Sequence, residues 1–178
     1  MLRRPVVPND AHSPGLEVRL VPARVLTEAG WLVGKLHVAR AWRMIDYINH
    51  APEFIALADV VLEGRPKVLP LFTLRRSAIS FIVVETEQDR QMDLPARDFV
   101  VHPCAWLMPN GSLYGRIEVA RGIRLSDYLS KARGFILVQD VHFQLRNVWD
   151  KRIIDHRESA VLLNPHAPIG VAEYPEEG

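Results

Sequence analysis

Apolar and polar residues alternate along two neighbouring segments near the start of the chain, residues 18–26 and 31–40, which the turn sequence TEAG separates. The same pattern returns at residues 99–108 and 112–121, with PNG between them. Because successive side chains of a strand point to opposite faces, this alternation predicts half-buried β-strands, and the short polar interruptions predict tight turns. We therefore expect each region to begin with a β-hairpin.

A helical period comes after each predicted hairpin. Met44, Tyr47 and Ile48 are spaced as i, i+3 and i+4 in RMIDYINHA, and the segment RLSDYLSKA repeats this spacing in the second region. The spacing places apolar side chains on one face and predicts a short helix in each region. Segments rich in Val, Ile, Leu and Phe come next and predict three further strands. They lie at 54–64, 68–74 and 77–85, with counterparts expected at 135–145, 147–154 and 159–163.

The two regions are similar in sequence. Residues 30–65 align with residues 111–146 at a constant offset of 81 without a gap, and 15 of the 36 aligned positions are identical. Similarity at a fixed offset indicates an internal repeat. We therefore predict a mainly β (α+β) fold with two repeated β-β-α-β-β-β units, which form a pseudo-twofold pair of small curved sheets or half-barrels.

The sequence around the repeats is rich in proline and charge, which favours tails and a linker over a core. The predicted boundaries are a flexible N-terminal tail at 1–17, unit one at 18–84, a charged linker at 85–98, unit two at 99–166 and an acidic C-terminal tail at 167–178.

Composition narrows the class of protein. The chain has 178 residues, of which 48% are hydrophobic and 24% charged, which is typical of a globular protein that can bury a core. The net charge is +1. Unit one has nine basic and five acidic residues and unit two has nine and six, so both units are basic, but only weakly. A nucleic-acid partner is therefore possible but not favoured.

The cysteine content and the length of the apolar runs indicate the cellular compartment of the protein. Cys104 is the only cysteine, so no internal disulfide can form and a reducing compartment fits best. No apolar run reaches the roughly 18 residues that span a bilayer, and prolines at positions 5 and 8 interrupt the N-terminal segment before a signal-peptide core develops. We expect a cytoplasmic protein without a membrane partner.

Few residues suggest catalysis or metal binding. Cys104 and His102 share one face of a predicted strand, but the first region has Ala23 and Val21 at the equivalent positions. No phosphate-binding glycine motif and no G-x-S-x-G motif is present. We therefore predict no cofactor, no metal and no catalytic residue, and do not expect an enzyme.

A family resemblance rests on the string R-x-x-D-Y-(I/L), followed by F-I-x-(L/V)-x-D-V, in both regions. It resembles an uncharacterised β-rich bacterial domain family, present here as a tandem duplication, and this resemblance implies no activity. A weaker likeness is to Sm-like RNA-binding barrels, although a helix after the second strand does not match their order of elements.

Polar residues that recur in both regions are the candidate binding residues. Arg43 and Asp46 stand at the i, i+3 spacing of an intrahelical ion pair, which also allows a purely structural role. The full candidate set is Arg40, Arg43, Asp46, Tyr47 and Asp59, with Arg121, Arg124, Asp127, Tyr128 and Asp140. We expect both tyrosine rings to be largely buried, with hydrogen-bonded hydroxyls.

Duplication without a catalytic constellation favours a non-catalytic binding or scaffolding module that acts through protein–protein contacts or self-association. The first alternative is a small nucleic-acid-binding β-barrel protein. The second is a small-ligand sensor that uses the groove between the repeats.

Overall fold

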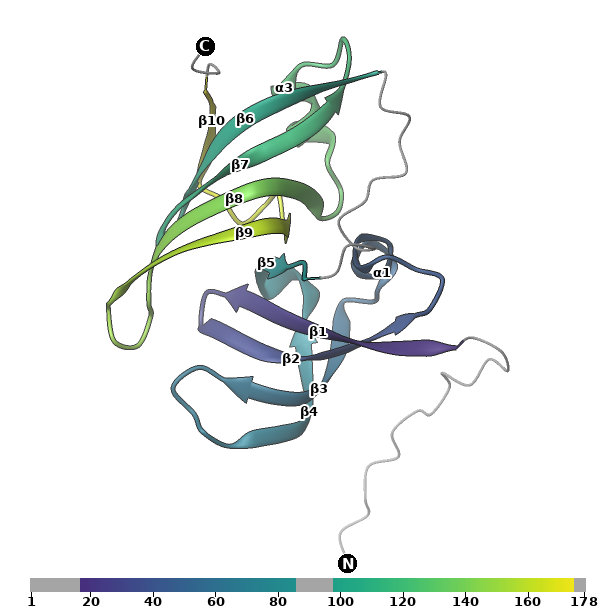
Figure 1. Cartoon of the computed structure of the whole chain (residues 1–178), viewed down its shortest axis with the longest axis vertical. Coiled ribbons are helices and arrows are strands. Elements are labelled where there is room, and N and C mark those ends of the chain that lie inside the picture. The colour runs from purple at the N-terminus through teal and green to yellow at the C-terminus, as the bar shows by residue number, and fades with distance from the viewer. Residues whose placement is uncertain (1–16, 86–97, 175–178) are drawn as a thin grey trace, which may run out of the picture.

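A single antiparallel sheet of ten strands runs through both halves of the protein (Figure 1). The computed structural model describes residues 17–85 and 98–174. The mainly β prediction is confirmed, whereas the two separate small sheets are replaced by one continuous open sheet. The first half contains β1 (Val18–Thr27), β2 (Gly30–Ala39), α1 (Met44–His50), β3 (Phe54–Leu62), β4 (Val68–Arg75), the 3₁₀ turn η1 (Arg76–Ala78) and β5 (Ile79–Val83). The second half contains β6 (Phe99–Met108), β7 (Gly111–Ala120), α3 (Leu125–Lys131), β8 (Ile136–Arg146), β9 (Ile153–Leu163) and β10 (Gly170–Glu173).

Both halves arrange five strands in the same way. The strand order is β5-β1-β2-β3-β4 in the first half and β10-β6-β7-β8-β9 in the second. The hairpins β1–β2 and β6–β7 pair with the same register, Val18 opposite Ala39 and Phe99 opposite Ala120. Each half also breaks the register of its next strand pair at the same place, after Val33 and after Tyr114.

The spacing between equivalent residues changes after β8. Ile55 pairs with Leu74, and Ile136, 81 residues after Ile55, pairs with Leu163, 89 residues after Leu74. The hairpin between β8 and β9 is therefore longer by eight residues than the hairpin between β3 and β4. An alignment at the constant offset of 81 therefore assigns the strands after this hairpin to the wrong residues. This explains two wrong predictions. The segment expected as a strand at 147–154 is mostly the β8–β9 loop, β9 runs from Ile153 to Leu163 and includes the strand expected at 159–163, and the expected tail 167–178 contains β10.

The two halves meet where β5 pairs with β9, in the register Phe81 opposite Leu163 and Ile82 opposite Leu162. This contact joins unlike edges, because β5 lies beside β1 at one end of its half, and β9 lies beside β8 at the other end of its half. An isologous pseudo-twofold contact would join like edges instead. The halves are therefore arranged head to tail.

Strand β5 is buried on both faces, and its side chains enter two separate cores. Ile82 and its neighbour Leu162 belong to the core that includes Met44 and Ile48 of α1. Phe81 on the same strand belongs to the other core, which includes residues of α3. A strand covered on both faces carries a continuous apolar run instead of an alternating one, as ISFIV does.

The two helices therefore cover opposite faces of the sheet. α1 lies beside the junction and α3 lies over the second half (Figure 1). Both are single short helices of seven residues, so their stability comes from docking apolar side chains onto the sheet. Among the described residues, neither helix is long and apolar enough to cross a bilayer.

Candidate protein-binding surface

The ten repeated polar residues do not form one site. They occupy three places in each half: the chain after the first hairpin, the short helix, and the bulge in the third strand. Arg40 and Arg121 come directly after β2 and β7, where their backbone N–H groups donate to the carbonyls of Glu17 and Asp98, at 2.7 Å in each case. These backbone bonds close the end of each hairpin and do not require an arginine side chain, while the Arg40 side chain pairs with Glu17.

The helix residues behave differently in the two halves. The Arg43 guanidinium binds the Asp46 carboxylate through two bonds, Nε to Oδ2 at 2.8 Å and Nη2 to Oδ1 at 3.1 Å. The hydrogen bond from the Arg43 side chain lowers the pKa of Asp46, against the effect of burial. In the second half, by contrast, the structure places both Arg124 and Asp127 on the surface without an ion pair between them.

Asp59 and Asp140 occupy the bulge of the third strand in each half. Their φ angles are 52° and 50°, the left-handed region in which aspartate is tolerated better than most residues. Each faces a basic side chain on the adjacent strand: Lys35 Nζ lies 2.9 Å from Asp59, and Arg116 Nη1 lies 3.6 Å from Asp140. All four side chains are about half exposed, so these pairs add little stability.

The two tyrosines pack on the cores only in part. Tyr47 lies against the core beneath α1, and Tyr128 against the core beneath α3. Burial raises the pKa of both hydroxyls. Neither hydroxyl has a hydrogen-bond partner among residues 17–85 and 98–174, so the structure does not support the expected hydrogen-bonded hydroxyls. Both rings are half-buried, whereas Met44 and Ile48 of α1 are fully buried.

Cys104 is buried, and this burial, together with the nearby Glu173 carboxylate, raises the pKa of its thiol to about 12. His102 pairs instead with Glu173, with 2.6 Å between Nδ1 and Oε1. In the part of the chain that the structure describes, no group of three His, Cys, Asp or Glu residues is placed to hold a metal ion.

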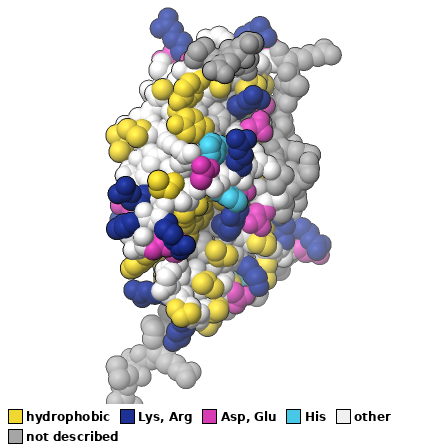
Figure 2. Space-filling view, turned by 60° about the vertical axis from the view of Figure 1, so that its left-hand side comes forward, with side chains coloured by type: hydrophobic (Ala, Val, Ile, Leu, Met, Phe, Trp, Pro, Cys, Tyr) yellow, Lys and Arg dark blue, Asp and Glu magenta, His cyan; other side chains and the backbone are white. Residues whose placement is uncertain are grey.

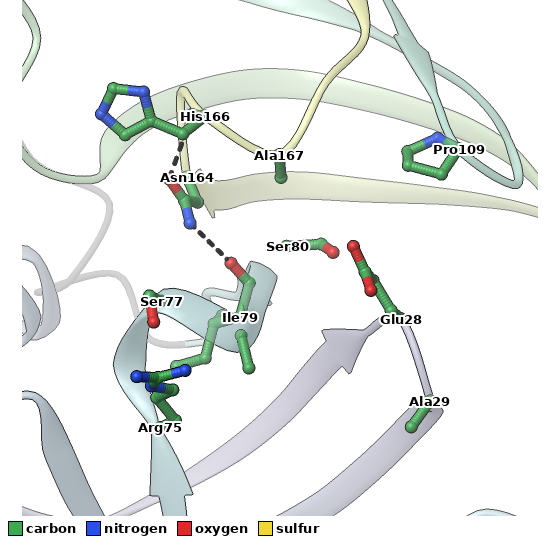
Figure 3. A pocket seen from close by; sticks show the side chains of 11 residues that line it. Glu28, Ala29, Arg75, Ser77, Ile79, Ser80, Pro109, Asn164, His166 and Ala167 are labelled. Carbon is green, nitrogen blue, oxygen red and sulfur yellow. Dashed lines mark hydrogen bonds between the residues drawn. The ribbon is translucent and has the colours of Figure 1, made fainter.

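A hollow of about 450 Å³ lies where the halves meet, at one end of β5 and β9. Figure 3 shows Asn164 within its lining, joined to the backbone of Ile79 and of His166. Asn164 donates from Nδ2 to the Ile79 carbonyl at 2.9 Å and accepts the His166 N–H on Oδ1 at 3.1 Å. Its polar atoms therefore already have partners within the protein, and its role is to fix the junction.

The outer face of the second half carries a row of rings and polar groups. Tyr114 stacks on His142 at a centroid distance of 6.0 Å, and His142 Nε2 lies 2.7 Å from Asp155 Oδ1. Hydrogen bonds from His142 and Gln144 lower the pKa of Asp155. In the first half the positions paired across β2 and β3 are Val33 and Val61. The outer faces of the two halves therefore differ in chemistry.

Exposed apolar side chains lie at both outer edges of the sheet, as well as on inner strands, where Val18 is 54% and Ile153 is 70% exposed. At the β4 edge, Phe54 is 57% exposed and Leu71 is 62% exposed. At the β10 edge, Ile169 is 68% exposed, Leu107 is 56% exposed and Val171 is 43% exposed. We call these the β4 edge surface and the β10 edge surface. They were absent from the predicted site, because the sequence alone does not tell an edge strand from a central one.

Comparisons with protein-family models, with curated protein sequences and with solved structures give no match to this chain. The resemblance to an uncharacterised bacterial domain family therefore stays a prediction.

Proposed function

We propose that this chain is a non-catalytic binding or scaffolding protein, a tandem of two copies of one unit, which binds protein partners at the open edges of its sheet. One observation carries the proposal. The β4 and β10 edge surfaces combine strand backbone that pairs on one side only with large exposed apolar side chains, such as Leu71 and Ile169. An unpaired strand edge is a template for another strand, and apolar side chains beside it give such pairing its stability.

Natural proteins usually protect sheet edges with charges, prolines, bulges or a covering element. Pro70 lies within β4 and Arg75 ends it, but the residues between them, Leu71 to Leu74, are apolar or neutral. β10 has one charged residue, Glu173, at its end. Both edges are therefore weakly protected. This favours edges that a protein partner covers over edges that stay exposed to water.

The nucleic-acid alternative has less support, because acidic partners neutralise many of the basic side chains. Such pairs are Arg24 with Glu158 and Glu85, Lys35 with Asp59, Arg40 with Glu17, Arg43 with Asp46, Arg75 with Glu53, Arg116 with Asp140 and Arg152 with Asp150. Figure 2 shows acidic and basic side chains interspersed on one face, with two histidines near its middle. A nucleic-acid surface would gather one sign of charge.

The groove hypothesis also has less support than the edges. The hollow between the halves is lined by Asn164, whose side-chain atoms already bond to the protein backbone.

A photo-crosslinking amino acid placed at Leu71 or at Ile169 tests the proposal. We expect both positions to crosslink to protein in cells, in nuclease-treated samples and at high salt. Val33 is the control position, since it is 47% exposed but lies on β2, where it is paired on both sides, with β1 and with β3. Equal crosslinking from all three positions, or crosslinks that nuclease removes, would contradict binding at the edges.

A further inference from the structure

We propose that the partner at both edges is a second copy of this chain, and that β10 of one molecule pairs antiparallel with β4 of the next. This inference rests on the proposed function and gives the binding surface its partner. The two strands lie at opposite ends of the ten-stranded sheet (Figure 1). One molecule can therefore offer both edges at once.

The contact between the two halves supplies the template. β10 pairs with β6 in the register that β5 has with β1: Val171 lies opposite Trp106, as Ile82 lies opposite Val25. β4 pairs with β3 in the register that β9 has with β8. The two outer edges are therefore the counterparts of the two edges that already pair inside the molecule.

This correspondence fixes the register between two molecules. Inside the chain Ile82 lies opposite Leu162, and their counterparts at the outer edges are Val171 and Thr73. Val171 of one copy is therefore expected opposite Thr73 of the next, with Gly170 opposite Leu74.

The backbone groups needed for this pairing point outward. The N–H of Arg76 donates to the carbonyl of Glu53, and that of Tyr174 donates to the carbonyl of Pro103. Because hydrogen-bonded positions alternate along an antiparallel strand, the N–H and C=O groups of Thr73 and Val171 face away from β3 and β6. They are oriented to bond to another strand.

Side-chain burial at the β4 edge supports the same conclusion. Phe54 is 57% exposed, whereas its counterpart at the junction, Phe135, is 7% exposed. Leu71 is 62% exposed, whereas its counterpart Ala160 is 1% exposed. The internal contact thus covers the positions that the outer edge leaves in water.

The β10 edge shows the same contrast. Leu107 is 56% exposed and its counterpart Leu26 is 2% exposed, while Ile169 is 68% exposed and its counterpart Ser80 is 7% exposed. Ile169 is thus an exposed apolar side chain at a position that the junction covers. A second molecule that pairs in the internal register would cover both.

The contact between molecules should be weaker than the internal one. Asn49 of α1 bonds across the junction to Phe135, but its counterpart in α3 is Ser130, which bonds within its own helix to Ser126. Phe81 at the centre of the junction is replaced by Gly170 in β10. We therefore expect reversible association that depends on concentration. Because unlike edges pair, it should give open chains or rings rather than a closed twofold dimer.

Two edge variants of the full chain test the inference. Thr73→Pro and Val171→Pro each remove an outward N–H, a change that an edge strand tolerates within its own sheet. Light scattering after size-exclusion chromatography should show species larger than the 20.2 kDa monomer for the wild type and monomer for each variant. An equimolar mixture of the two variants should form a dimer and nothing larger, because each supplies the edge that the other lacks.

A second pair, Leu71→Lys and Ile169→Lys, alters only side chains at the same edges and guards against misfolding by proline. Val33→Lys is the matched control, since Val33 is 47% exposed but lies on the central strand β2, and it should associate like the wild type. If the wild type stays monomeric, the proposed self-association is wrong, whereas the proposed binding to other proteins is unaffected. Association that survives both variant pairs, or variants that fail to complement each other, overturns the β4–β10 contact.

Discussion

The Asn49 side chain makes both of its hydrogen bonds across the two halves to one residue, Phe135. It donates from Nδ2 to the Phe135 carbonyl at 3.1 Å and accepts the Phe135 N–H on Oδ1 at 2.7 Å. The side chain thereby satisfies the backbone of the residue that precedes β8 and attaches α1 to the second half. This contact and the pairing of β5 with β9 hold the halves in one arrangement.

Replacing Asn49 by Ala should destabilise the protein by about 1–3 kcal/mol, because the N–H and carbonyl of Phe135 lose their partner in a half-buried place. Urea denaturation followed by circular dichroism measures the change. Ser130→Ala is the matched control at the equivalent helix position, where the hydroxyl bonds only to the carbonyl of Ser126 in its own helix. A shift as large in the control as in Asn49→Ala would contradict a specific role for the cross-half contact.

Gly115→Ala should also destabilise the fold, by about 1–3 kcal/mol, the usual cost of overpacking. A Cβ at this position would lie 2.6 Å from Val138 Cγ1 and 2.9 Å from the Gln139 carbonyl oxygen. Gly170→Ala is the control, because a Cβ there meets nothing within 4 Å. Thermal unfolding of the two variants should differ clearly, and equal melting temperatures would argue against close packing at the bulge.

Tyr47→Phe should leave the urea midpoint unchanged, because the hydroxyl of Tyr47 has no partner within the described part of the chain. Tyr47→Ala should lower it, since the ring packs on the core beneath α1. A large loss of stability in Tyr47→Phe would show that the hydroxyl makes a contact that this structure lacks.

The thiol of Cys104 should resist alkylation at pH 8 in the native protein and react after unfolding. Its pKa is raised to about 12 by burial, so the thiolate that reacts is scarce, and the sulfur is covered. The folded state holds this proton more tightly than the unfolded state, so stability should fall as the pH rises above the ordinary thiol value. Rapid labelling under native conditions would contradict this burial.

Asp46→Asn should destabilise the protein at neutral pH, and this destabilisation should disappear at low pH. The hydrogen bond from Arg43 lowers the pKa of Asp46, so the ion pair stabilises the protein above the ordinary aspartate pKa and is lost as the pH falls through the folded value. Urea midpoints of the wild type and the variant should therefore converge between about pH 6 and pH 3. Asp127→Asn, which removes no such pair, should differ little from the wild type at any pH in this range.

Much of the fold was predictable from the sequence because hydrophobic patterning is local. The alternation in residues 18–26 and 31–40 and the helical spacing of Met44 and Ile48 correspond to β1, β2 and α1. The pairing of β5 with β9 was not predictable, because a strand buried on both faces has no period that shows which strands lie beside it. Because the hairpin between β8 and β9 is longer, an alignment at a constant offset also failed to predict β10.

The candidate site was harder to predict than the fold. Recurrent polar residues such as Asp59 and Asp140 stood out in the alignment of the two repeats, but the structure places them at strand bulges, where they serve the backbone. The exposed edges carry apolar residues that look like core in sequence. Phe54 and Phe135 are identical in type, but the junction covers Phe135 and leaves Phe54 exposed.

The odd number of strands in each half determines how the two cores lie. Antiparallel pairing reverses the direction of the chain at every strand, so equivalent strands of the two halves, five positions apart, run in opposite directions. Because the strand order is the same in both halves, the second half is rotated so that its equivalent face lies on the other side of the sheet. With an even number, both helices would lie on the same side, and the opposite faces of β5 and β9 would be open to water. With five, each core extends across the junction onto the face that the other half leaves bare. The parity of the strand count thus accounts for the unbroken apolar run in β5.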